Sequence, residues 1–310
     1  MSTSRRVALV VNPASGRGRS AESGAIVQQR LTERGFEVVT IVGADAATTQ
    51  ALLRESIAET PTAAVVACGG DGTVHLCVQV IAETDVALGI IPVGTGNDSA
   101  LALGIPTDLL AAADVIADGL SGGQIRVLDL GFARAGDGEQ RWFLGVLSSG
   151  FDSLVNERAN RMSWPTGQAR YIAAILGELR VFRAVPYVMD LDAGLSTASQ
   201  ESKPGMLVAV GNGPRYGGGM RVCPQACFDD GLLSVTFLDE LSTPTFLRVF
   251  PTVYKGTHIK RPEVHQYLAT TVRLEAADQV AYADGERIGP LPVEVRVVAG
   301  AARVLMPRTR

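Results

Sequence analysis

The sequence predicts an α/β protein with two domains, a doubly wound parallel sheet followed by a β-sandwich-like domain. Up to about Gly119, short apolar runs rich in β-branched residues alternate with helical segments, which is the pattern of successive βαβ units. Beyond residues 121–123 the chain changes to many short β-rich runs separated by turn residues, which favours an antiparallel sandwich. The length of 310 residues is sufficient for both domains.

Each element of the first domain follows from the local pattern. Its strands are expected at 7–11, 63–67 and 86–91. A helix over 20–34 should end at Gly35, because glycine is favoured just beyond a helix C-terminus. A second helix near 45–59 should end before Pro61. A third helix starts at Thr73 and has an apolar stripe that would pack on a sheet, formed by Val74, Cys77, Val78 and Ile81.

The second domain is expected to consist mainly of strands, with one or two helices between them. The β-rich runs are 124–133, 141–149, 186–191, 206–210, 232–238, 270–274, 279–283 and 293–298. One helix, over 169–183, is amphipathic and would pack on the sheet through Ile172, Ile175, Leu176, Leu179 and Phe182. A final strand over 302–306 could belong to either domain.

Composition argues against several classes of function. A net charge of −4 argues against nucleic acid as the main partner, while local basic patches remain compatible with it. No run of about 18 apolar residues is present to cross a bilayer. The N-terminus leads straight into a strand without a signal-type apolar core. We therefore expect a cytoplasmic protein.

The four cysteines indicate neither a disulfide framework nor a zinc site. Cys68 and Cys77 fall on a buried strand and on the apolar face of a helix, so they are interpreted as core residues. Cys223 and Cys227 lack a second pair of ligands at zinc spacing.

The segment 69–73, Gly-Gly-Asp-Gly-Thr, is the most informative stretch of the chain. It joins a buried strand to a helix, and the free backbone N–H groups there favour a bound anion. Asp71 would repel a phosphate unless a cation or a transferable proton lay between them, which indicates Mg²⁺-nucleotide chemistry. Taken alone, the glycines fit a tight turn without a ligand equally well.

Two further loops support the phosphate-site interpretation. Asn-Pro-Ala-Ser-Gly at 12–16 follows the first strand, and Pro-Val-Gly-Thr-Gly-Asn-Asp at 92–98 follows the strand over 86–91. In an open parallel sheet the carboxyl ends of the strands share one edge, so the three loops should converge on one crevice. The Gly-x-Gly-x-x-Gly fingerprint of dinucleotide-binding proteins is absent after the first strand.

Three motifs in the second half carry further chemistry. A glycine loop over 211–220 follows a strand and indicates a sharp bend or a close backbone approach. Asp230 could bind a cation together with backbone carbonyls, or Asp230-Gly231 could be a hairpin turn without an ion. Glu286, after the turn signal Asp284-Gly285, could be a general base or a solvated hairpin residue.

Together these motifs resemble those of the bacterial diacylglycerol kinase family of soluble lipid kinases, which is related to sphingosine kinases and more distantly to NAD kinases and phosphofructokinases. The motifs occur in the family's order over nearly the whole chain, at 12–16, 69–73, 94–98, 216–220 with Pro224, 229–233 and 284–286. The resemblance implies an NAD kinase/phosphofructokinase-like first domain and an active site in the interdomain cleft. It also implies transfer of the ATP γ-phosphate to the primary hydroxyl of diacylglycerol or a similar lipid, giving phosphatidic acid or an analogue.

The resemblance further implies domain limits and residue roles. Residues 1–123 would bind ATP, with 302–310 able to return to that domain, and 124–301 would bind the lipid. The ATP-binding residues would be Asn12, Pro13, Ala14, Ser15, Gly16, Thr40, Gly69, Gly70, Asp71, Gly72, Thr73 and Thr95. Glu286 would be the catalytic base, and Asp71 would act in catalysis by holding the catalytic Mg²⁺ together with Asp98 and Asp129. A structural Mg²⁺ would be held by Asp230 and by the carbonyls of Cys227 and Leu232.

The chain departs from the family pattern at two places. His75-Leu76 replaces the usual Asn-Glu after the glycine motif, and Ser99 replaces the usual Phe. The first departure removes a polar pair close to the nucleotide and puts nucleotide preference in doubt. It motivates one alternative, a catalytically weak nucleotide-binding regulator. A second alternative is an NAD kinase-like enzyme, since the motif at 69–73 is shared with NAD kinases.

A lipid kinase also needs access to a membrane. One group of basic residues surrounds the 169–183 helix and Trp164, namely Arg158, Arg161, Arg170, Arg180 and Arg183, and a second comprises Lys255, His258, Lys260 and Arg261. Such mixtures are typical of interfacial docking, although each group also fits a solvated surface. We expect transient peripheral contact with anionic lipid at the inner face of the membrane. Sheet edges make a homodimer plausible as well.

Overall fold

The computed structural model describes residues 4–12, 20–162, 164, 168–179 and 182–308. The chain divides into two compact units. Unit 1 comprises Met1–Leu130, Gly217–Gly219 and Val298–Arg310, and unit 2 comprises Gly131–Tyr216 and Met220–Val297. The long strands β5 (Ile125–Arg134) and β15 (Val293–Leu305) each contribute residues to both units.

Unit 1 is built on a parallel sheet. Its strands β1 (Arg6–Val11), β2 (Glu37–Ile41), β3 (Ala64–Gly69) and β4 (Ala87–Pro92) lie in the order β4-β3-β1-β2. Every residue of β1, β3 and β4 is buried, as expected for strands covered on both faces. The last part of β15 adds a further parallel strand at the edge of β4, with Arg303 opposite Ala87.

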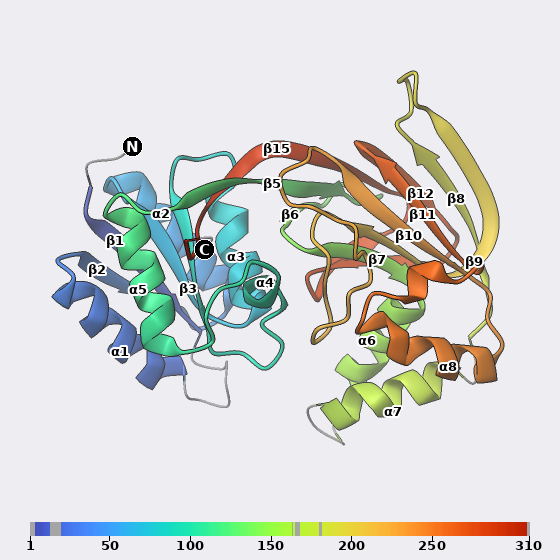
Figure 1. Ribbon diagram of the computed structural model, residues 1–310, viewed down its shortest axis with the longest axis horizontal. Helices are drawn as coiled ribbons and strands as arrows, with labels where there is room; N and C mark the ends of the chain where they lie inside the picture. Colours follow the sequence, from blue (N-terminus) through green and yellow to red (C-terminus); the bar gives the residue numbers. More distant parts are fainter. Residues whose placement is uncertain (1–3, 13–19, 163, 165–167, 180–181, 309–310) are drawn as a thin grey trace. The chain divides into compact units, whose positions relative to one another are not determined.

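Helices cover both faces of this sheet (Figure 1). They are α1 (Ser20–Glu33), α2 (Ala46–Glu59), α3 (Asp71–Ile81), α4 (Asp98–Ala102) and α5 (Leu109–Leu120). Helix α1 packs beside α5, whereas α2 packs beside α3. Asp45 caps α2 by accepting the N–H of Thr48, and Asp108 caps α5 by accepting that of Ala111. The doubly wound domain predicted from the sequence is therefore confirmed.

Unit 2 is an antiparallel β structure, as predicted. Besides its parts of β5 and β15, its strands are β6 (Gln140–Phe143), β7 (Val146–Gly150), β8 (Val185–Leu191), β9 (Ser199–Gly211), β10 (Leu233–Asp239), β11 (Val264–Ala269), β12 (Thr271–Glu275), β13 (Val280–Ala283) and β14 (Glu286–Pro290). Strand β9 pairs with β8 through its first half and with β7 through its second half, and β10 also pairs with residues 205–211 of β9. Tyr187, Phe143 and Phe237 are the largest side chains of the core between the strands.

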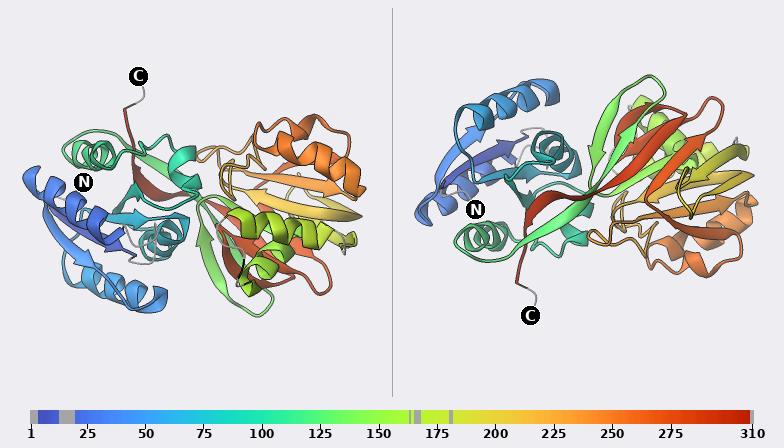
Figure 2. Two further views of the ribbon diagram at one scale, coloured as in Figure 1. Left: turned by 90° about the horizontal axis from the view of Figure 1, so that it is seen from below. Right: turned by 90° about the horizontal axis from the view of Figure 1, so that it is seen from above.

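Among the described residues, three helices belong to unit 2, and Figure 2 gives two further views of the protein. They are α6 (Phe151–Arg161), α7 (Gln168–Leu179) and α8 (Thr243–Val253), and a 3₁₀ turn follows at His258–Lys260. Phe151 of α6 packs against Phe246 of α8, with 5.0 Å between ring centroids, and against Phe182 after α7. These aromatic contacts join the three helices in one apolar cluster.

The structure differs from the sequence-based expectation in several elements. Helices α6 and α8 and strand β11 were not predicted, and the expected strand over 141–149 is split into β6 and β7. The expected strands over 293–298 and 302–306 are one strand, β15. On α7, Leu179 is buried as predicted, while the side chains of Ile172 and Leu176 lie outside the described residues. Across the described residues, no helix has the length and hydropathy needed to span a bilayer.

Candidate active site

The glycine motif lies where β3 passes into α3, at the carboxyl end of the sheet. Gly70 is the N-cap of α3, and its carbonyl accepts the backbone N–H groups of Thr73 (2.9 Å) and Val74 (3.2 Å). A Cβ on Gly69 would clash with the side chain of Thr73, which is only 3% exposed. The motif therefore needs glycine for close packing, and it presents a helix N-terminus at the strand end.

The loop after β4 packs directly on this motif. The N–H of Gly94 donates to the carbonyl of Gly69 (3.3 Å), and a Cβ built on Gly94 would lie 2.5 Å from the Cα of Gly70. Asn97, in the left-handed region at φ +54°, donates from its side chain to the Gly94 carbonyl. After β1, the N–H of Asn12 donates to the Cys68 carbonyl (3.5 Å). The loops after β3 and β4 thus meet, and Asn12, the described start of the loop after β1, lies beside the end of β3.

Asp71 holds the start of α4. Its carboxylate accepts the backbone N–H groups of Asp98 (3.1 Å) and Ser99 (2.9 Å). The buried carboxylate of Asp98 accepts in turn the N–H groups of Gly218 (2.7 Å) and Gly219 (2.5 Å), which also belong to unit 1. Two carboxylates therefore link the glycine motif, the loop after β4 and the loop at 217–219.

The structure does not assemble the acidic network suggested for Mg²⁺. Asp129 is buried, and its carboxylate accepts the N–H of Gly300 (2.8 Å), whereas those of Asp71 and Asp98 both lie beside Gly96. In the part of the chain that the structure describes, no group of three or more His, Cys, Asp or Glu side chains is arranged to hold a metal ion. Only Asp71 and Asp98 are brought together, because the short loop 94–97 places α4 against the glycine motif.

Of the remaining residues expected to bind ATP, some are exposed in the structure and others lie outside the described residues. Thr95 and Asn12 are exposed on the converging loops. Thr40 is exposed near the end of β2, where its hydroxyl donates to the side chain of Gln28 (3.1 Å). Four candidates lie outside the described residues: Pro13, Ala14, Ser15 and Gly16.

The candidate structural cation site forms a compact turn in unit 2. Asp230 is exposed, and its Oδ1 accepts the backbone N–H of Leu232 (3.0 Å). Gly231 between them has a φ of +72°, which favours glycine. Cys227 is also exposed, and its thiol donates to Asp229 (3.2 Å), which raises the pKa of the thiol. One carboxylate with nearby backbone carbonyls is a donor set that suits a hard cation.

Glu286 opens strand β14, directly after the turn Asp284-Gly285, and is exposed. Both turn residues have positive φ, +52° and +87°. The carboxylate of Asp284 accepts three backbone N–H groups, those of Leu144 (2.9 Å), Gly145 (2.9 Å) and Val146 (3.2 Å). Asp284 thus fixes the turn that carries Glu286 against the β6–β7 connection.

Sequence reasoning treated Asp284 as an ordinary turn residue and did not find its partners. The side chain of Asn212 supports the same connection, since it donates to the carbonyl of Leu144 (2.8 Å). The only sequence signal was the Asp-Gly pair itself, which does not reveal contacts more than a hundred residues away. Asp152 at the start of α6 was also missed: burial raises its carboxyl pKa, although the hydroxyl of Ser148 donates to it (2.7 Å).

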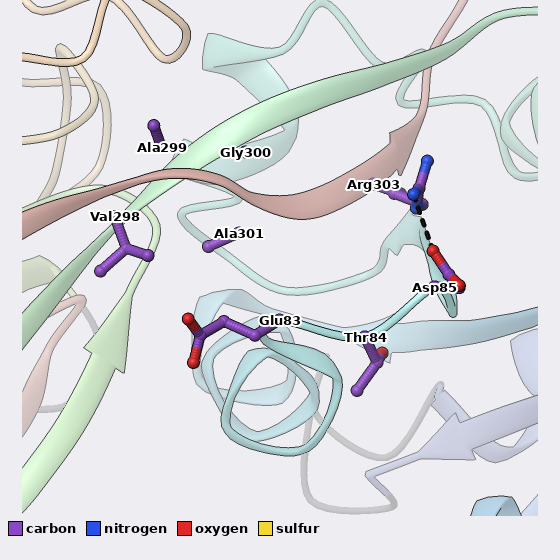
Figure 3. Close-up of a pocket in the computed structure, with 8 residues that line it drawn as sticks. All are labelled: Glu83, Thr84, Asp85, Val298, Ala299, Gly300, Ala301 and Arg303. Carbon is purple, nitrogen blue, oxygen red and sulfur yellow. Dashed lines mark hydrogen bonds and ion pairs between the residues drawn. The ribbon is translucent and has the colours of Figure 1, made fainter.

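A cavity of about 480 Å³ lies elsewhere in unit 1 (Figure 3). Residues 83–85, which precede β4, form one wall, and residues of β15 form the other. Asp85 and Arg303 form an ion pair across it at 2.7 Å. The glycine motif and the loop at 93–97 instead follow the carboxyl ends of β3 and β4, at the opposite end of the sheet from residues 83–85. This cavity is therefore separate from the candidate nucleotide residues.

Comparison with known proteins finds similarity to lipid kinases over nearly the whole chain. Residues 6–133 match the model of the diacylglycerol kinase catalytic domain, and residues 145–306 match that of the YegS C-terminal NAD kinase beta sandwich-like domain. The chain is 43% identical over 304 residues to a diacylglycerol kinase of Mycobacterium tuberculosis (strain ATCC 25618 / H37Rv), covering 98% of this chain and 96% of the relative.

Other relatives are more distant. A diacylglycerol kinase of Bacillus subtilis (strain 168) is 28% identical, covering 99% of this chain and 98% of the relative. A probable YegS-like lipid kinase of Stenotrophomonas maltophilia (strain K279a) is 31% identical, covering 78% of each chain. Among solved structures, a putative diacylglycerol kinase from Bacillus anthracis str. Sterne matches with a TM-score of 0.76 at 21% identity, covering 99% of both chains. The solved structure supports the fold.

Proposed function

Because the chain belongs to the diacylglycerol kinase family of ATP-dependent lipid kinases, we propose that it transfers the γ-phosphate of ATP to the primary hydroxyl of diacylglycerol or a similar lipid alcohol. The product would be phosphatidic acid or an analogue. The observation that carries the proposal is the close approach of Gly70 and Gly94 at the N-terminus of α3. Backbone can approach a phosphate closely there, and the helix N-terminus favours the negative charge.

We propose that ATP is held by residues 12–16 and 69–73, by Thr40 and by Thr95. The contact between the loops after β3 and β4, with Asn12 beside the end of β3, supports this assignment. Phosphoryl transfer depends mainly on positioning and charge neutralisation, so a rigid set of backbone donors is well suited to it. The hydrogen bonds of Asp71 and Asp98 to backbone N–H groups would provide this rigidity.

Magnesium is the expected counterion. Asp71 and Asp98 fit this role, since each carboxylate oxygen that accepts an N–H group retains a second lone pair. Asp129, the third carboxylate expected at this ion, accepts the N–H of Gly300. When bound with ATP, Mg²⁺ would neutralise charge on the phosphates. Asp230, with the carbonyls of Cys227 and Leu232, would hold a structural ion.

We propose Glu286 as the base that accepts the proton of the lipid hydroxyl. Its exposure leaves the carboxylate accessible to a substrate, and the anchored Asp284 limits the movement of the turn. Domain roles follow from this assignment: residues 1–123 would serve ATP, and 124–301 would serve the lipid. We further propose a cytoplasmic protein that contacts anionic membrane transiently at its inner face, with a homodimer as a plausible assembly.

The test is transfer of labelled γ-phosphate from ATP, with Mg²⁺, to a panel of lipid alcohols in mixed micelles and to NAD. We expect label in a lipid alcohol, and we expect Glu286→Gln to abolish most of it. Label in NAD alone would instead indicate an NAD kinase-like activity. Binding of ATP without transfer to any acceptor would indicate a nucleotide-binding regulator, the alternative that His75-Leu76 left open.

A further inference from the structure

Helix α8 of unit 2 has two different faces. Its inner face is buried through Phe246 (5% exposed) and Val249 (6% exposed), which pack with α6 and α7. Its outer face is a single exposed stripe at helical spacing, which continues past the end of α8 and comprises Pro244, Leu247, Arg248, Pro251, Tyr254 and Lys255. Tyr254 still has helical backbone angles, φ −61° and ψ −30°. Figure 1 labels α8, which is drawn in orange.

The outer stripe combines large apolar side chains with unpaired cations. Leu247 is 51% exposed and Tyr254 is 49% exposed. Arg248 and Lys255 are exposed, and no acidic side chain of the described residues forms an ion pair with either of them. The sequence contains no Asp or Glu between Glu240 and Glu263. We call Leu247, Arg248, Tyr254 and Lys255 the α8 face.

The other basic group considered from the sequence is different. Around α6 and α7, Arg158 forms an ion pair with Glu178 and Arg161 forms one with Glu157. These acids reduce the attraction of that surface for anionic lipid. His258 of the second basic group is not available to a membrane surface, since it is only 4% exposed and its Nε2 lies 3.1 Å from the Val222 carbonyl. The α8 face retains its positive charge.

We propose that the α8 face docks on a bilayer surface rich in anionic phospholipid. Leu247 and Tyr254 enter the interfacial region, and Arg248 and Lys255 contact the headgroups, which is how amphipathic basic helices bind membranes. A second copy of the chain fits less well, because a two-fold contact would bring the same cations toward each other. The inference rests on the proposed function, since that function requires the protein to reach a lipid in a bilayer.

The test is co-sedimentation of the full-length protein with vesicles of phosphatidylcholine, with and without phosphatidylglycerol. We expect binding only to the phosphatidylglycerol vesicles, weakened by added salt. Since each interfacial cation contributes about a fivefold factor, the double variant Arg248→Gln/Lys255→Gln should bind about 25-fold more weakly. Leu247→Ser and Tyr254→Ser should also weaken binding.

Matched variants serve as controls. Leu195 is 53% exposed, so Leu195→Ser removes a similar apolar surface from unit 2, and Arg54→Gln/Arg141→Gln removes two exposed cations. Both should bind vesicles as the wild type does. Equal vesicle binding by the wild type and by the α8 variants would overturn the proposal. The proposal would also be overturned if analytical ultracentrifugation without vesicles detected a dimer and the α8 variants dissociated that dimer.

A second readout separates this inference from the proposed function. On a short-chain diacylglycerol that dissolves in water, the α8 variants should keep wild-type kinase activity, because docking is not needed there. On vesicles their activity should fall in proportion to binding. If the wild type phosphorylates no lipid alcohol but binds phosphatidylglycerol vesicles through the α8 face, the proposed function fails and the docking surface stands.

Discussion

The carboxylate of Asp71 accepts a hydrogen bond from the backbone N–H of Asp98, with 3.1 Å between Oδ2 and N. This contact places one acidic side chain of the glycine motif at the start of the helix that carries the other. A carboxylate that would repel a phosphate therefore has a structural function in the protein itself. This structural role of Asp71 and its proposed role at the nucleotide can be separated by substitution.

Replacing Asp71 tests its structural function. Asp71→Ala leaves the N–H groups of Asp98 and Ser99 without their acceptor, which should lower the free energy of unfolding by about 1–3 kcal/mol. Asp71→Asn keeps one acceptor oxygen and should lose less, while kinase activity should fall in both variants. Urea denaturation and the transfer assay measure the two effects. Equal destabilisation by Asn and Ala would count against this account.

Replacing Glu286 tests the proposed base. Because Glu286 is exposed, Glu286→Gln should change the free energy of unfolding by no more than about 0.5 kcal/mol. Loss of a general base should lower kcat by about 10²- to 10⁴-fold with little change in KM for ATP. Glu294→Gln, another exposed glutamate on a strand of unit 2, is the control and should keep full activity. A kcat of Glu286→Gln within a few fold of the wild type would exclude this role.

Replacing Asp284 tests the anchoring of the turn. At φ +52°, glycine is tolerated without backbone strain, so Asp284→Gly removes the acceptor for three N–H groups, a loss of about 1–3 kcal/mol of stability, to which the greater entropy of the unfolded chain adds. Asparagine also tolerates this conformation and keeps one oxygen, so Asp284→Asn should recover part of the stability. With Glu286 still present, kcat should fall in the glycine variant and recover in the asparagine variant. If Asp284 served only the local turn, its replacement would lower stability, but kcat would not fall in the glycine variant and recover in the asparagine variant.

His258 predicts a pH dependence of stability. Burial lowers the pKa of its imidazole below the usual 6.5, although its contact with the Val222 carbonyl opposes the shift. The unfolded chain therefore binds a proton more readily than the folded chain. Stability should be fully present above the unfolded pKa of about 6.5 and decline as the pH falls through the lower folded value. Urea denaturation between pH 8 and pH 5 should show this decline in the wild type and less of it in His258→Gln.

The meeting of the loops after β3 and β4 could be predicted from the sequence because it follows from local patterns. Strands over 7–11, 63–67 and 86–91 end in glycine-rich or polar segments, and parallel strands present those ends at one edge. The contact between Gly70 and Gly94 is a direct result. By contrast, the bond between the Asp129 carboxylate and the N–H of Gly300 joins two strands 171 positions apart, and no local sequence pattern predicts it.

The missed elements of unit 2 have a common physical reason. Helix α8 contains Pro251 and several β-branched residues, which lower its intrinsic helix propensity, and its helicity depends on the packing of Phe246 and Val249. The split between β6 and β7 depends on the distant Asp284, whose carboxylate accepts hydrogen bonds from the backbone N–H groups of the connection. Only tertiary contacts specify these features.

Strand β15 has a practical consequence for dissecting the protein. Its final residues, Arg303 and Val304, cover the edge of β4 in the parallel sheet, although they are more than two hundred positions from it in sequence. A fragment truncated at residue 123 would leave that edge with unpaired N–H and C=O groups, a template for strand addition between molecules. Expression of residues 1–123 alone should therefore give aggregated material, and a fragment that retains 298–310 through a linker should remain monodisperse.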